Sequence, residues 1–121
     1  MENLQFETLK GLTLTAVEKF SNNYDRIIFE TLCGRTFIME HIQDCCESVW
    51  IEDVVGDLDD LIGNPILVAE CVEGEVTYDN WGGDQQYTFY KIDTVKGGVT
   101  IRWNGSSNGY YSISVGFYEE K

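Results

Sequence analysis

The sequence lacks positive charge in its middle third. Of 121 residues, 8 are Lys or Arg and 21 are Asp or Glu, which gives a formal net charge of −13. Residues 41–79 contain 11 of these acidic side chains and no Lys or Arg, whereas residues 80–121 contain four of each sign. Binding to a nucleic-acid duplex needs a basic surface for the phosphates. We therefore expect no duplex-binding function.

Long apolar runs and secretory features are also lacking. No segment approaches the roughly 18 apolar residues of a membrane span. Residues 1–5 have neither the basic region nor the apolar core typical of a signal peptide. We expect no membrane contact and a location in the cytoplasm. The length and the 43% hydrophobic content are typical of one folded domain, 1–121.

Motifs for metal binding and catalysis are few. The chain has one His and four Cys, with no C-x-x-C pair, P-loop, H-E-x-x-H motif or nucleophile elbow. His41, Asp44 and the pair Cys45-Cys46 leave a metal or thiol site open as an alternative, but a turn with structural polar groups is the simpler interpretation. We predict no enzyme activity, no cofactor and no metal. Cys33 and Cys71 are expected to be small buried residues.

Alternation of apolar and polar residues predicts a β-rich protein with antiparallel sheets of about six to seven strands. The expected strands are 12–20, 26–31, 35–41, 66–72, 87–94, 99–103 and 111–117, with 48–54 as a further candidate. The first three should form one antiparallel meander and the last three another. Arg102 and Trp103 are consecutive in the clearest alternation, which places them on opposite faces of the sheet.

One short acidic helix is expected from Asp57 to Gly63. Leu58, Leu61 and Ile62 recur at helical spacing and would lie on one face. Asp57 is suited to the N-cap and Gly63 to the position after the C-cap. The predicted fold class is therefore α+β, with a β-rich body and this single helix.

Aromatic, amide and hydroxyl side chains gather in the last third of the chain. Rings such as Trp103 and Tyr110 can stack a nucleobase, and neighbouring amides and hydroxyls can hydrogen-bond its edge. Ordinary packing within a sheet is the alternative for most of these rings. The loop at 106–111 is harder to explain by packing alone, because loops on a rigid sheet commonly bind ligands.

Three strings resemble a family of small uncharacterised proteins of tailed bacteriophages and prophages. They are H-x-Q-D-C-C-E at 41–47, G-D-L-D-D-L-I-G at 56–63 and S-N-G-Y-Y-S at 107–112. The resemblance implies a phage protein that counters host immunity, like the sponges that hide the cyclic nucleotide signals of CBASS or Thoeris defence. Such a protein sequesters its ligand without cleaving it and is expected to be a homo-oligomer in the host cytoplasm.

For a cyclic nucleotide ligand we expect aromatic, cationic and amide side chains to form the site. The candidates are His41, Asp44, Tyr90, Arg102, Trp103, Ser107, Asn108 and Tyr110. A second function stays open, because the acidic segment 41–79 resembles a surface that blocks the basic groove of a host nuclease or DNA-binding factor.

Overall fold

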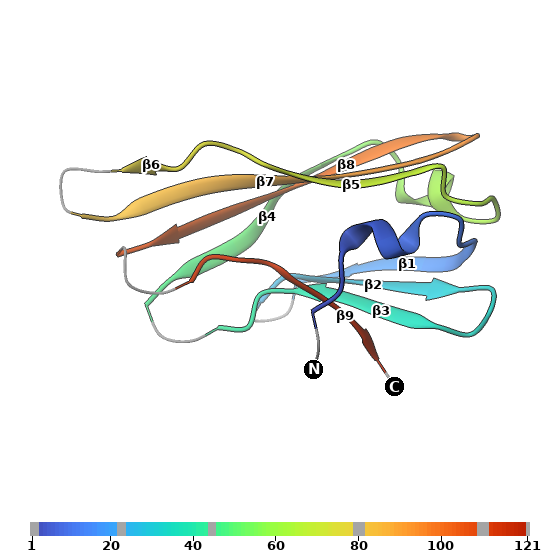
Figure 1. The fold of residues 1–121 in the computed structure, drawn as a ribbon, viewed down its shortest axis with the longest axis horizontal. Coiled ribbons are helices and arrows are strands. Elements are labelled where there is room, and N and C mark those ends of the chain that lie inside the picture. The colour runs from blue at the N-terminus through green and yellow to red at the C-terminus, as the bar shows by residue number, and fades with distance from the viewer. Residues whose placement is uncertain (1–2, 22–23, 44–45, 79–81, 109–111, 121) are drawn as a thin grey trace.

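The computed structural model describes residues 3–21, 24–43, 46–78, 82–108 and 112–120. Within these ranges the chain forms two antiparallel β-sheets packed as two layers (Figure 1). The first sheet contains, in spatial order, β1 (Leu14–Phe20), β2 (Arg26–Thr31), β3 (Thr36–Glu40) and β9 (Gly116–Glu120). The second contains β4 (Ser48–Val55), β8 (Gly97–Ser107), β7 (Asp84–Thr94) and β5 (Val68–Glu73), with β6 (Thr77–Tyr78) paired to β7.

The core lies between the two sheets and is closed at one side by the 3-10 turn η1 (Phe6–Leu9). Trp103 of β8 is 1% exposed, and its indole N–H donates to the sulfur of Met39 on β3 at 3.1 Å. Phe6 packs edge-on against Phe117 with ring centroids 5.3 Å apart. These contacts join residues far apart in sequence, so the hydrophobic effect across the layers holds the fold together.

The predicted N-terminal meander is confirmed, because β1, β2 and β3 pair as antiparallel neighbours. The opposite orientation of Arg102 and Trp103 is also confirmed, since Arg102 is half-buried while Trp103 is in the core. The prediction of a β-rich protein is therefore confirmed. The strand count was too low, because the described ranges contain nine strands, among them β6 within residues 73–84, where a loop was expected.

The predicted helix is a single 3-10 turn, η2 (Leu58–Leu61), and the described residues contain no α-helix. Asp57 is the N-cap as expected and accepts a hydrogen bond from the backbone N–H of Asp59 at 2.9 Å. Gly63 follows the C-cap with a φ of +89°. The few residues between Asp57 and Gly63 form too few backbone hydrogen bonds to offset the free energy of helix nucleation, so the turn does not extend into an α-helix.

The predicted C-terminal meander is wrong in its last strand. β7 and β8 form a long hairpin, but β9 crosses to the other sheet and pairs with β3. β9 starts at Gly116 instead of Tyr111, which lies outside the described residues. The strand expected at 99–103 also extends further, because β8 runs from Gly97 to Ser107.

Cys33 and Cys71 are exposed, which corrects the prediction that both are buried. Cys33 lies in the turn between β2 and β3, and Cys71 lies on β5, an end strand of the second sheet. Both are free thiols. Cys33 lies in a turn and Cys71 at a sheet edge, and at both places the side chain stays outside the core.

Candidate functional site

Two of the predicted ligand-binding rings are core residues. Tyr90 of β7 is 5% exposed and packs edge-on against Phe6 at 4.9 Å, and Trp103 is 1% exposed. Burial raises the pKa of Tyr90 well above its usual range, with a further contribution from Cys71 on the neighbouring strand. Rings with so little exposed area offer almost no face for a ligand to stack on, so we leave Tyr90 and Trp103 out of the site.

Arg102 lies on the outer face of the second sheet, as the alternation predicted. Its guanidinium carbon is 5.1 Å from the centroid of the Tyr87 ring, a cation–π arrangement. The Nε atom of Arg102 is buried and has no hydrogen-bond partner among the described residues. A buried N–H without an acceptor is costly, so this edge of the guanidinium is suited to an acceptor that a ligand brings.

Two rows of side chains cross this outer face, as the strand register shows. In one row Trp50, Asn104 and Tyr87 lie side by side on β4, β8 and β7. In the next row Arg102 stands between Asp53 of β4 and Phe89 of β7, with Val72 of β5 beyond Phe89. We call these seven residues the outer-face platform. Cross-strand neighbours of this kind are about 5 Å apart, so the rings and the guanidinium form one continuous surface.

The outer-face platform is open to solvent. In Figure 1 no helix or other strand lies over the outer side of β5, β7 and β8. Trp50 is 36% exposed and Val72 is 44% exposed. Asn104 is buried, and its side-chain oxygen accepts a hydrogen bond from Gln85 at 3.1 Å. The platform therefore combines exposed apolar area with a fixed amide and one half-buried cation.

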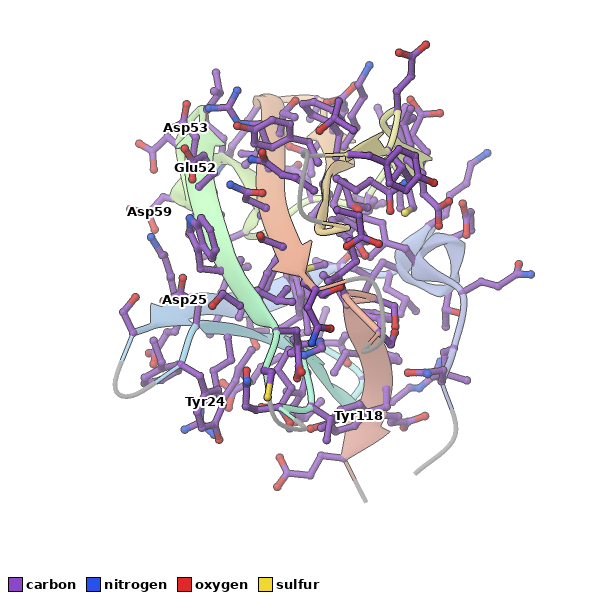
Figure 2. All side chains as sticks on the ribbon, turned by 90° about the vertical axis from the view of Figure 1, so that its left-hand side faces the viewer. Tyr24, Asp25, Glu52, Asp53, Asp59 and Tyr118 are labelled. Atoms are coloured by element: carbon purple, nitrogen blue, oxygen red, sulfur yellow. The ribbon has the colours of Figure 1, made fainter. Side chains whose placement is uncertain are left out.

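Acidic side chains border the platform along β4, which is an end strand of its sheet. Figure 2 shows Glu52, Asp53, Asp59 and Asp25 along one side of the molecule. Asp53 stands opposite Arg102 in the register. No ion pair within 4.0 Å joins Arg102 to a carboxylate in the part of the chain that the structure describes.

His41 is remote from the platform in the fold and is part of a different arrangement. It follows β3, is 8% exposed, and points Nδ1 at the backbone oxygen of Ser114 at 2.7 Å and Nε2 at Oε1 of Glu47 at 3.0 Å. The Ser114 carbonyl can only accept, so Nδ1 bears a proton. Either a charged imidazole then donates to Glu47, or a protonated Glu47 donates to the ring. In both cases one proton is held between two buried groups.

The other predicted residues do not converge on either arrangement. Ser107 is buried at the end of β8 and donates to the carboxylate of Asp84 at 2.8 Å, while Asn108 is exposed just beyond. Asp44 and Tyr110 lie outside the described residues. The described residues of the predicted site therefore lie in separate places. Among them, Arg102 alone is on the outer-face platform.

The metal alternative at 41–46 gains no support from the described ranges. They contain no cluster of three or more His, Cys, Asp or Glu side chains suited to a metal ion. Cys45 is not in these ranges, and Cys46 is exposed and disulfide-bonded. Among the same residues, no helix has the length and apolar character needed to span a membrane.

Sequence reasoning missed Trp50 and Tyr87 as partners of Arg102. The three residues are brought together by pairing across β4, β8 and β7, and only the register of those strands shows it. Tyr87 and Phe89 have the same parity and face away from the buried Tyr90 and Ile92, but that orientation is seen only in the structure.

A family model described as a domain of unknown function (DUF7448) matches residues 7–117 of the chain. The protein therefore belongs to this family. Comparisons with curated proteins and with solved structures gave no match.

Proposed function

We propose that this member of the DUF7448 family is a non-catalytic binding protein for a small ligand of the cyclic nucleotide class. The observation on which the proposal depends is the Arg102 guanidinium, which lies over Tyr87 with a buried, unpartnered Nε on an open sheet face. Such a ligand combines an aromatic base with an anionic phosphodiester, and the platform offers a partner for each.

Each part of such a ligand, the base and the phosphodiester, has its own binding groups on the platform. A base can stack on the exposed Trp50 ring or on the free face of the Arg102 guanidinium. The fork of guanidinium N–H groups can donate two parallel hydrogen bonds to a phosphate. The carbonyl and amine edges of a base can then be read by the Asn104–Gln85 amide pair, which is already held by its own hydrogen bond.

The biological role in the proposal follows from the three sequence strings that resemble phage proteins. In this role the protein is encoded by a phage, acts in the host cytoplasm, and sequesters a cyclic nucleotide immune signal as a homo-oligomeric sponge. A net charge of −13 opposes the approach of an anion. Salt screens that repulsion, so the association rate of an anionic ligand should rise with ionic strength.

The experiment is a thermal-shift screen against cyclic di- and trinucleotides and cyclic ADP-ribose isomers, followed by recovery of the ligand. A ligand that binds only the folded state raises the melting temperature by mass action. The proposal expects a strong shift with one ligand and its recovery intact after the protein is denatured. Absence of any shift contradicts nucleotide binding, and a hydrolysed ligand contradicts sequestration.

A second candidate function is supported by the acidic edge of β4. Glu52, Asp53 and Asp59 are exposed and lie on one side of the molecule with the exposed Val55 between them in sequence (Figure 2). An end strand can pair with an extended segment of another protein, although the Ile51 N–H of β4 already donates to Asp25 at 2.7 Å. Carboxylates nearby select a basic segment. The candidate is a protein that blocks a basic surface of a host nuclease or DNA-binding factor.

The test of this candidate is capture of host proteins at low and high salt. Replacing Glu52, Asp53 and Asp59 by their amides should abolish capture of a basic partner, because surface charge attraction is lost. The matched control replaces Glu18 and Glu30, exposed acids of the first sheet. Equal capture by both variants would refute the acidic-edge candidate.

A further inference from the structure

A cavity of about 400 Å³ lies at the end of the first sheet, away from the outer-face platform. Asn3, His41, Ser112, Ser114 and Tyr118 line it, together with Ile42 and Gly116. It is formed where residue 41, just after β3, approaches the segment 112–115 that precedes β9, through the His41–Ser114 hydrogen bond. Figure 2 places Tyr118 at the opposite end of the view from Glu52 and Asp53.

Most of the polar groups that line this cavity are small hydroxyls and amides. Ser112 and Ser114 offer hydroxyls, which hydrogen-bond to each other at 2.8 Å. Asn3 uses its side-chain oxygen to accept from the Phe117 N–H at 3.3 Å, which leaves its amide N–H₂ to donate. None of the lining residues that the structure describes is Lys or Arg. His41 is already paired with the Glu47 carboxyl, so an anionic ligand finds no cation without a partner among these residues.

Two buried carboxylates stand behind the cavity wall and fix its donors and acceptors. Glu40 accepts from the Tyr118 hydroxyl, so the lone pairs of that phenol oxygen remain to accept from a ligand. Glu47 contacts His41, and the other ring nitrogen of His41 is engaged with Ser114. Because each carboxylate is already engaged with a wall residue, a cationic ligand would also lack a direct partner.

We infer that this cavity binds a neutral polyhydroxyl ligand, with the chemistry of a sugar. Each sugar hydroxyl both donates and accepts, which matches a wall of two serine hydroxyls, one amide donor and one phenol acceptor. The Tyr118 ring and Ile42 supply apolar area for the C–H face of a sugar. The volume lies in the usual range for small-molecule sites, which starts near 300 Å³. This inference is independent of the outer-face platform.

The test is a two-dimensional amide NMR titration of the full chain with glucose, trehalose, ribose and adenosine. Free sugars and the ribose of an uncharged nucleoside share the hydroxyl chemistry, and the separate titrations distinguish them. We expect saturable shifts for residues 112–118 with at least one of these probes. The double variant Ser112→Ala, Ser114→Ala should bind about tenfold more weakly, since two hydrogen bonds are lost.

The matched control is Ser21→Ala, Ser48→Ala, which removes two exposed hydroxyls from a neighbouring cavity lined by Tyr24, Asp25 and Glu47. This control should bind the probe as the native protein does. Ser112 and Ser114 are also exposed, so their replacement leaves the core intact. If no probe gives saturable shifts near residues 112–118, or if the Ser112, Ser114 variant binds with native affinity, the inference is overturned.

Discussion

Tyr90 should make the stability of the fold depend on alkaline pH. Burial, followed by the neighbouring Cys71, raises the pKa of its hydroxyl well above the usual value near 10. In the unfolded chain the hydroxyl ionises near pH 10, whereas in the folded protein it keeps its proton. A folded pKa above the unfolded one gives a stability contribution that is complete below pH 10 and is lost as the pH rises further.

The expected loss attributable to Tyr90 is about 1.4 kcal/mol of unfolding free energy for each pH unit above 10. Urea unfolding at a series of alkaline pH values measures it, with native protein and Tyr90→Phe compared. Phenylalanine keeps the contact with Phe6 and cannot ionise, so the variant should lose stability less steeply by that amount. Tyr87→Phe, which makes the same substitution on the outer face, is measured alongside as a reference. An equal slope for Tyr90→Phe and native protein would refute the reasoning.

Two further predictions concern the thiols and the glycines. A hydrogen bond with Thr31 lowers the pKa of Cys33, whereas partial desolvation of the thiol raises the pKa of Cys71 although that residue is exposed. Iodoacetamide labelling near neutral pH should therefore modify Cys33 first, and equal rates by peptide mass spectrometry would contradict this. Gly56→Ala should destabilise by at least about 2 kcal/mol, because φ is +108° and the added Cβ would overlap a carbonyl oxygen of β8. Gly34→Ala, with φ +88° and open space, should lose only about 1 kcal/mol; equal losses in urea unfolding contradict the packing argument.

Local patterns were enough to predict three of the four strands of the first sheet. β1, β2 and β3 are joined by short connections, so each strand pairs with its neighbour in sequence. The hairpin of β7 and β8 was predicted for the same reason. In both cases alternation and turn residues lie within a few residues of the pairing that they specify.

The last strand could not be placed from its own residues. Ile113 and Val115 alternate with polar residues as a strand would, yet the segment 112–115 is not in a strand. Instead Ile113 packs onto Gly105 of β8, where an added Cβ would lie 2.7 Å from the Ile113 Cβ. The chain then passes to the other sheet and pairs with β3. A contact that depends on the absence of a side chain on another strand has no signal in the alternation.

The residues around Arg102 could be predicted only in part, because their alignment also depends on contacts between strands. Alternation placed Arg102 on the outer face and Trp103 inside, and both placements are correct. It did not show that Tyr90 faces inward, because Tyr87, Phe89 and Tyr90 allow either parity at the start of the hairpin. The partners of Arg102 come from β7 and β4, and the register that aligns them is set by tertiary packing.

The most direct test of the proposed function is a calorimetric titration of the nucleotide panel into native protein, Arg102→Lys and Arg26→Lys. Arg26 lies over Phe20 at 5.1 Å, the same distance that separates Arg102 from Tyr87, but on the first sheet. Lysine keeps the charge and loses the planar stacking and the fork of donors. The account predicts binding to native protein and to Arg26→Lys, with affinity at least about tenfold lower for Arg102→Lys. Native affinity in Arg102→Lys, or no binding of any nucleotide to native protein, would contradict it.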